Sequence, residues 1–331
     1  MGAKPTEGGY DPRSRRGGER PIRIPAPDDG MVKSVLVASD FTEASHKPVR
    51  HAISIARHFK AKFYLGHVVS SVGYTIAGAD ALDLATNAAH RDVAEVERKL
   101  EEDGTLAELS HEFIVRRGEI WEELEAIIRE KQVELLVIGT HARQSLGRLV
   151  LGSLTEQIFR EADNLVLTVG PHAMLEAQLE ISDGSRSFLF ATDFSEASFQ
   201  ALPYAVTFAN HFKKRLVLLH VAPVMPIPES FSWSSAPEGI APLREAAREA
   251  ALKKLSEFIS GNLHFAVKPE LRVEFGKHGE QILRVARGLK TDLIILGLDH
   301  SKHGRSAAHL PMTTAYQVVC QAPCSVLTVR S

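Results

Sequence analysis

The feature that most constrains this chain is an internal repeat. The segment SVLVASDFTEAS at residues 34–45 returns as SFLFATDFSEAS at residues 187–198. Three further pairs follow in the same order: FYLGHVV at 63–69 and LVLLHVA at 216–222, ELLVIG at 134–139 and DLIILG at 292–297, and VLTV at 166–169 and 326–329. Four matches in one order at nearly constant spacing predict a duplicated domain.

The repeat divides the 331 residues into four segments. We expect a disordered tail over residues 1–30, a first copy over 31–170, a linker over 171–185 and a second copy over 186–331. The tail is dense in Gly, Pro, Arg and Asp and offers little apolar surface to bury. Two domains also suit the length, because a single hydrophobic core stops growing near ~250–300 residues.

Composition excludes several classes of protein. Hydrophobic residues make up 44% of the chain and charged residues 24%, which is typical of a soluble globular protein. The formal charge of -2 gives no electrostatic argument for binding nucleic acid or a membrane surface, and no apolar run approaches the ~20 residues of a membrane helix. Cys320 and Cys324 are too few for a disulfide framework. We therefore expect a cytoplasmic protein without a nucleic-acid or membrane partner.

Short apolar runs alternate with helical patterns within each copy. In the first copy the runs expected as strands are 35–38, 63–69, 111–116, 135–138 and 165–169. The helices expected between them are one entered through Pro48, two over 81–102 and 120–131, and one that opens at Gly152. Five strands and four helices in alternation predict an open, parallel, Rossmann-like α/β sheet in each copy. Ligands bind such sheets at the carboxyl ends of the strands.

The stretch GTHARQSLGRLVLGSLTEQIF follows the fourth strand of the first copy, from Gly139. Ser153 is expected to be the N-cap of the next helix, in a Ser-x-x-Glu capping box. The N-terminus of that helix would attract phosphate, and Gly139 and Gly152 would let the backbone approach an anion closely. Arg143 and Arg148 add positive charge nearby. The alternative is that both glycines only form a turn and a helix cap.

Together these segments resemble the universal stress protein family, twice over residues 31–331. The resemblance rests on the TDFSE-like motif after the first strand, the LLHV-like second strand, and the glycine loop, whose family pattern is Gly, two residues, Gly, nine residues, Gly, then Ser or Thr. It implies ATP binding, with the carboxylate of Asp40 at the ribose, the backbones of Ala38 and Val68 at the adenine, and the loop around the phosphates. The residues expected at the nucleotide are Ala38, Asp40, Val68, Gly139, His141, Ala142, Arg143, Gly152, Ser153, Leu154 and Thr155.

Each copy departs from the family pattern. In the first copy, Ala142 stands where the family has its second glycine. In the second copy the pattern begins at Gly297, and its next positions fall on His300, Leu310 and Pro311. A proline at the helix start would donate no N–H, and Asp299 would place a negative charge beside a phosphate. We therefore expect ATP, with or without Mg²⁺, in the first copy only, and a structural role for Asp193.

Other candidate chemistry is weaker. His67 and His220 end apolar strands and are expected to be core histidines bonded to the backbone. A cluster of Asp299, His300, His303 and His309 matches no zinc spacing, so no metal site is expected. No nucleophile elbow, P-loop lysine or general base is identifiable. We therefore expect no enzyme beyond a slow ATPase.

Two functions stay open at this point. The first is a stress-response regulator that binds ATP in its first copy and thereby changes its interaction with an unidentified protein partner. The second is a nucleotide-independent scaffold of the same fold. The resemblance also implies that the two VLTV strands pair within the chain as a pseudo-twofold dimer, since single-copy members of the family pair through that strand. Such pairing is expected to leave the helical faces free for a second chain or a partner, so a homo-oligomer is a further alternative.

Overall fold

A computed structural model describes residues 32–72, 78–140, 143–145, 148–171, 173, 186–224, 236–260, 263–299 and 313–330. The expected tail over residues 1–30 and nearly all of the expected linker lie outside these ranges. Within them, the side chains of residues 143–145, 148–150 and 236–241 are also not described.

The first copy has the predicted alternation of strands and helices. Its elements are β1 (Ser34–Ala38), η1 (Glu43–Ser45), α1 (His46–Phe59), β2 (Lys62–Ser70), α2 (Ala79–Glu102), β3 (His111–Gly118), α3 (Ile120–Lys131), β4 (Leu135–Gly139), β5 (Arg143–Ser145), β6 (Arg148–Val150), α4 (Ser153–Glu161) and β7 (Leu165–Val169). The buried strand residues are largely apolar, as in Leu36 and Phe63, because both faces of the sheet are covered by helices. Pro48 lies in the first turn of α1, where the missing N–H breaks no helical hydrogen bond.

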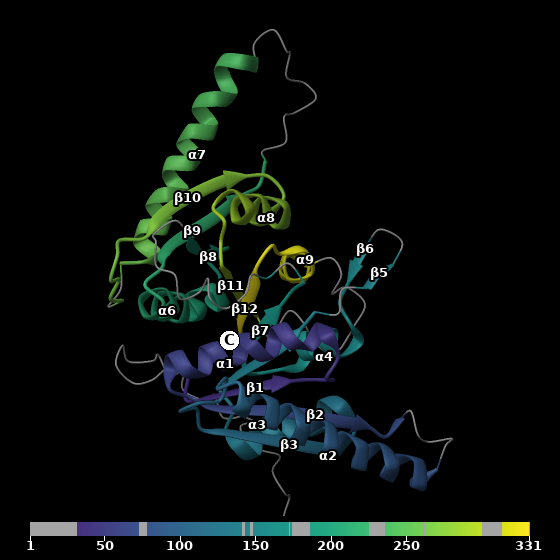
Figure 1. The fold of residues 1–331 in the computed structure, drawn as a ribbon. Coiled ribbons are helices and arrows are strands. Elements are labelled where there is room, and N and C mark those ends of the chain that lie inside the picture. Colours follow the sequence, from purple (N-terminus) through teal and green to yellow (C-terminus); the bar gives the residue numbers. More distant parts are fainter. Residues whose placement is uncertain are drawn as a thin grey trace, which may run out of the picture.

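The second copy repeats this order. Its elements are β8 (Ser187–Thr192), α6 (Glu196–His211), β9 (Arg215–Ala222), α7 (Ala236–Phe258), β10 (Glu270–Phe275), α8 (His278–Gly288), β11 (Leu293–Leu298), α9 (Thr314–Gln321) and β12 (Ser325–Arg330). Figure 1 shows α2 and α7 as the long helices of the two copies, each extending from its own end of the molecule. No helix in the described ranges is both long enough and apolar enough to cross a bilayer.

All the long strands form one ten-stranded sheet in the order β10-β9-β8-β11-β12-β7-β4-β1-β2-β3. Neighbours within each copy are parallel, whereas β12 and β7 pair antiparallel where the copies meet (Figure 1). Leu327 lies opposite Leu167, its own equivalent in the repeat. Equivalent residues that face each other define a twofold relation, so the predicted pseudo-dimer of paired terminal strands is confirmed.

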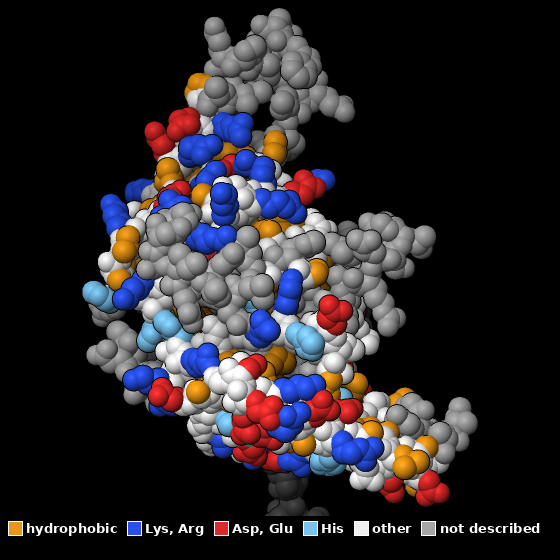
Figure 2. All heavy atoms as spheres, in the orientation of Figure 1, with side chains coloured by type: hydrophobic (Ala, Val, Ile, Leu, Met, Phe, Trp, Pro, Cys, Tyr) orange, Lys and Arg blue, Asp and Glu red, His pale blue; other side chains and the backbone are white. Residues whose placement is uncertain are grey.

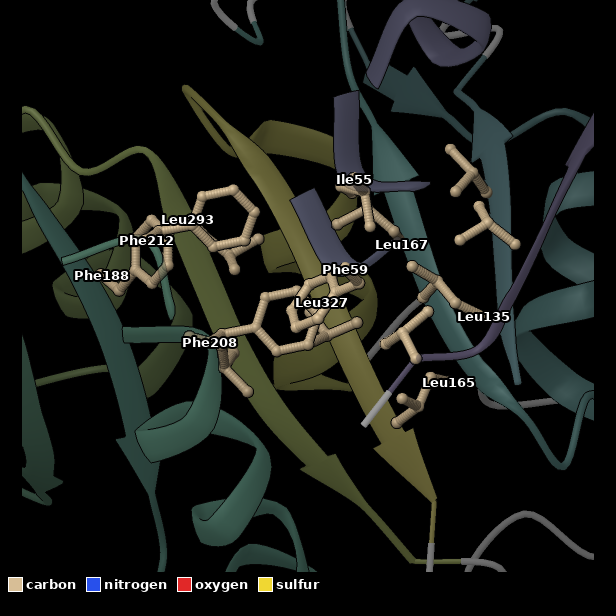
Figure 3. Close-up of a cluster of buried hydrophobic side chains, with 14 of the residues drawn as sticks. Ile55, Phe59, Leu135, Leu165, Leu167, Phe188, Phe208, Phe212, Leu293 and Leu327 are labelled. Atoms are coloured by element: carbon tan, nitrogen blue, oxygen red, sulfur yellow. The ribbon is translucent and has the colours of Figure 1, made fainter. Parts of the chain in front are cut away.

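Helices cover the seam between the copies on both faces. On one face, the ring centroids of Phe59 in α1 and Phe208 in α6 lie 5.3 Å apart. Beside them, the His58 ring stacks on the Phe212 ring with 4.1 Å between centroids. Figure 3 shows this cluster, with Leu167 and Leu327 beside the aromatic rings. On the other face, the ring of Phe159 in α4 lies 6.4 Å from the ring of Tyr316 in α9, between centroids. The helices of the two copies therefore also pack on each other across the seam, because a strand pair buried inside a continuous sheet needs apolar cover on both sides.

Charged side chains of both signs lie interspersed over the first copy on the face shown in Figure 2. This mixture agrees with the near balance of 39 basic and 41 acidic residues in the chain.

The seam predicts the response to buried charge. Leu167 and Leu327 are 2% and 0% exposed, so Leu167→Lys combined with Leu327→Lys should lower the free energy of unfolding by at least about 3 kcal/mol, because neither ammonium gains a partner. Limited proteolysis should then cut residues 171–185 faster. The matched control is Leu84→Lys with Leu243→Lys, at positions that are 70% and 55% exposed. An unchanged melting temperature in the seam variant would show that β7 and β12 do not hold the copies together.

Candidate functional site

A cavity of about 650 Å³ opens at the carboxyl ends of β1, β2 and β4. These strands are neighbours in the sheet, in the order β4-β1-β2, and the chain order of the strands reverses there. The cavity is lined by Ala38, Ser39, Asp40, Ser45, Gly66, His67, Val68, Ile120, Leu124, Ile138, Gly139, Leu151, Gly152, Ser153, Leu154, Thr155 and Ile158. Its volume lies within the ~300–1,000 Å³ typical of small-molecule sites.

Eight of the residues predicted to contact a nucleotide lie in this wall: Ala38, Asp40, Val68, Gly139, Gly152, Ser153, Leu154 and Thr155. His141 and Ala142 lie outside the described residues, and so does the side chain of Arg143. The backbones of Arg143 and Arg148 belong to the short antiparallel hairpin of β5 and β6. The expectation of a simple loop there is wrong, because these residues pair with each other as two strands.

A strained turn places Asp40 at the mouth of the cavity. Its Oδ1 accepts hydrogen bonds from the Thr42 backbone N–H at 3.1 Å and from the Thr42 hydroxyl at 2.7 Å. Phe41, between them, has φ of 59°, in the left-handed region that a bulky residue adopts only when its surroundings hold it there. The Phe41 ring lies 4.8 Å from the His67 ring, which holds the turn against β2.

His67 has the predicted structural role. Its Nδ1 lies 2.8 Å from the carbonyl oxygen of Ser39, and a carbonyl only accepts, so Nδ1 carries the proton. The second copy repeats the bond between His220 and the Thr192 carbonyl at 2.9 Å. Burial lowers the pKa of His220 and outweighs the bond to the Thr192 carbonyl, which acts to raise it. The predicted bond to the backbone is confirmed in both copies, but both histidines are half-buried and His67 lines the cavity.

The N-terminus of α4 differs from the predicted capping box. Gly152 is the N-cap, with extended backbone at ψ 152°, and Ser153 is already the first helical residue. No side chain caps this end, so the prediction that Ser153 caps it is wrong. Ser153 is helical and therefore cannot direct its hydroxyl back at the backbone N–H groups of its own turn. The N–H groups of the first turn face the cavity without a side-chain cap, which is the arrangement that attracts an anion.

Gly139 is required by packing. A Cβ at Gly139 would come within 2.9 Å of Pro48 Cγ in α1. In the second copy, a Cβ at Gly297 would lie 2.3 Å from the carbonyl oxygen of Ala197 in α6. The helix after the first strand therefore approaches the end of the fourth strand closely in both copies. This supports the structural alternative for Gly139, while the Thr155 hydroxyl, 3.1 Å from the Gly139 carbonyl oxygen, ties the same residue to α4.

The corresponding cavity of the second copy measures only about 220 Å³. The repeat aligns Gly66 with Leu219 and Ile120 with His278, and both Leu219 and His278 line this smaller cavity. A Cβ at Gly66 would lie 3.2 Å from Leu36 Cδ1, at the floor of the larger cavity. The absent side chain of Gly66 therefore accounts for part of the difference in volume. Sequence reasoning missed Gly66, although the mismatch between FYLGHVV and LVLLHVA signalled it.

In the second copy, the N-terminus of α9 and the carboxylate of Asp193 both form hydrogen bonds with neighbouring residues of the chain. Thr313 is the N-cap of α9, and its hydroxyl accepts from the Tyr316 N–H at 3.2 Å. The prediction that Pro311 begins this helix is wrong, because two extra residues separate β11 from α9 and move the helix start to Thr314. Burial acts to raise the pKa of Asp193, but hydrogen bonds from Ser195 and Ser198 outweigh it and hold the pKa below its usual value.

Comparison with known proteins finds one family in both copies. The model of the Universal stress protein family matches residues 31–170 and 184–330. A universal stress protein of Methanocaldococcus jannaschii is 29% identical over 146 residues, which are 43% of this chain and 84% of that protein. The crystal structure of a universal stress protein from Archaeoglobus fulgidus covers 90% of this chain and 98% of its own, at 15% identity and a TM-score of 0.63. A functionally unknown protein from Pseudomonas aeruginosa has a TM-score of 0.57 at 16% identity, over 91% of this chain and 93% of its own.

The N-termini of α4 and α9 are expected to respond differently to the loss of a hydroxyl group. Thr313→Ala should lower the free energy of unfolding by about 1 kcal/mol, because it removes the cap of α9. Ser153→Ala should change it by less than about 0.5 kcal/mol, because Ser153 caps nothing. Urea denaturation of the two variants beside the unchanged protein measures both values. A larger loss at Ser153 than at Thr313 would contradict the assignment of the caps.

Proposed function

Because the chain belongs to the universal stress protein family, we propose that its first copy binds ATP and that its second copy serves as a structural partner. The observation that carries this proposal is the meeting of the cavity of about 650 Å³ with the uncapped N-terminus of α4. An apolar chamber beside an unsatisfied helix N-terminus suits a ligand that combines a planar base with phosphates.

The wall of the cavity divides into parts that fit the parts of the nucleotide. Ile120 and Leu124 of α3, with the backbone at Ala38 and Val68, offer an apolar slot for the adenine. The carboxylate of Asp40 lies at the end of β1, within reach of a ribose hydroxyl. The first turn of α4 would receive the phosphates, and Leu154 and Thr155 would donate through their backbone N–H groups.

The second copy is suited to a different role. Its cavity of about 220 Å³ lies below the range typical of ligand sites, and its helix N-terminus is already capped by Thr313. In exchange, it supplies β12, which pairs with β7 along the edge of the first copy. We propose that bound ATP changes how this two-copy protein meets a protein partner in the cytoplasm under stress, with Mg²⁺ alongside the phosphates and with hydrolysis that is slow at most.

Nucleotide binding should be asymmetric. Isothermal titration of the nucleotide-free protein with ATP and Mg²⁺ should give one site per chain, and denaturing the freshly purified protein should release at most one equivalent of adenine nucleotide. Titrations with GTP and cAMP measure how far the adenine slot and the phosphate end select the ligand. Two equivalent ATP sites per chain would contradict the proposal. Complete absence of binding would favour the nucleotide-independent scaffold.

The two aspartates offer a matched pair for locating the site. Asp40→Ala should weaken ATP binding by about 1–3 kcal/mol, the range for a hydrogen bond to a charged group. Asp193→Ala should leave the affinity for ATP unchanged, because Asp193 lies beside the smaller cavity of about 220 Å³, where Thr313 already caps the helix N-terminus. Calorimetry gives both affinities, and circular dichroism confirms that the variants are folded. Equal losses of affinity would mean that the nucleotide does not lie beside Asp40.

A further inference from the structure

Three potential metal ligands converge at the amino-terminal end of β3, far from the cavity along the sheet. Glu97 and Glu101 lie on the same face of α2, and His111 is the first residue of β3. The Nε2 atom of His111 lies 3.7 Å from Glu97 Oε1 and 3.6 Å from Glu101 Oε1. All three ligand atoms lie within 4.8 Å of one another.

The His111 ring is held with one particular nitrogen toward the carboxylates. Its Nδ1 lies 2.8 Å from the carbonyl oxygen of Leu109, which can only accept a hydrogen bond, so Nδ1 carries the proton. The ring of Phe113 packs edge-on against the imidazole, at 6.0 Å between centroids and 89° between planes. In the neutral imidazole, Nε2 therefore directs its lone pair at two carboxylates. A backbone carbonyl that holds Nδ1–H is the usual support for a histidine that binds a metal through Nε2.

The charges of α2 also call for a cation between the two glutamates. Like charges one turn apart on a helix repel, and carboxylates near the C-terminal end of a helix face the negative end of its dipole. Among the described residues, the neighbouring cations of α2 are engaged with other carboxylates: Lys99 with Glu95 at 2.6 Å, and Arg98 with Glu102 at 2.7 Å.

The geometry points to a binding site for one divalent transition-metal ion, with Zn²⁺ as the representative, held by Glu97, Glu101 and His111. Zinc bonds of ~2.0–2.2 Å in tetrahedral geometry place ligand atoms about 3.4 Å apart, close to the two distances from Nε2. The imidazole favours zinc over Mg²⁺ or Ca²⁺, which prefer oxygen ligands alone. The glutamate side chains are 35% and 56% exposed, so water can complete the coordination.

The site would belong to the first copy alone. The repeat aligns Gly118 of the first copy with Gly276 of the second. His111 therefore corresponds to Pro269, which has no side chain that binds a metal. A metal ion here would fasten α2 to β3, the last strand at one end of the ten-stranded sheet. The metal would lie at the amino-terminal end of β3, whereas the nucleotide cavity lies at the carboxyl ends of β1, β2 and β4. The two sites can therefore be tested separately.

The test uses the full chain without a tag, free of nucleotide and treated with a chelator. Zn²⁺ titrated by calorimetry should bind tightly at one site per chain, Co²⁺ should give the intense visible absorption of a tetrahedral site, and Mg²⁺ should not compete. His111→Gln, and Glu97→Gln combined with Glu101→Gln, should each weaken Zn²⁺ binding at that site at least tenfold and remove the Co²⁺ spectrum. The matched controls are His90→Gln and Glu95→Gln on the same helix, which should leave both signals unchanged.

Two results would overturn the site. One is a protein that binds no Zn²⁺, in which case a protonated His111 paired with the two glutamates explains the cluster. The other is Zn²⁺ affinity that survives both ligand variants, which would assign the metal to other histidines. Far-ultraviolet circular dichroism checks folding, and the double glutamine variant removes a like-charge repulsion, so it is expected to remain folded without metal. Each measurement is made without ATP, so its outcome does not depend on the proposed nucleotide site.

Discussion

The antiparallel pairing of β7 with β12 is the interaction on which the rest of the structure depends. An unpaired terminal strand would leave a row of backbone donors and acceptors open at the edge of each sheet. The pairing satisfies both edges at once and places Leu167 opposite Leu327. It also brings α1 against α6 and α4 against α9, so one strand pair organises both layers of helices. The second copy would be needed for this reason even if it bound nothing.

The same fold gives the two copies different sites through a few local differences. Gly66 leaves space at the floor of the first cavity, where Leu219 fills the second. The N-terminus of α4 has no side-chain cap, whereas Thr313 occupies that of α9. The first difference concerns one side chain, and the second accompanies two extra residues between β11 and α9. A duplicated domain can in this way keep one copy for a ligand and the other for the shared sheet.

In the first copy, the carboxyl and amino-terminal ends of the strands suit different chemistry. The carboxyl ends of its strands face a chamber that combines apolar walls with the unsatisfied N–H groups of a helix, and an anionic ligand with a flat apolar part fits there. The amino-terminal end of β3 presents the opposite charge preference, because the carboxylates of Glu97 and Glu101 lie beside His111 Nε2 there. ATP at one end and a divalent cation at the other would each hold a helix against the sheet.

The sequence by itself determined the long strands and helices and their alternation in each copy, because apolar periodicity is a local property of the chain. The pairing of the copies was implied only by the family resemblance, and the register of β7 on β12 confirms it. The sequence also placed Asp40, Val68 and Gly152 at one cavity, since strand ends of a parallel sheet converge. Tertiary structure alone decided the rest. Whether Ser153 or Gly152 caps α4 depends on backbone angles that a one-residue shift changes, and the start of α9 depends on two inserted residues. The cluster of Glu97, Glu101 and His111 joins a helix to a strand across a turn, so only the packing of α2 on β3 could bring its ligand atoms together.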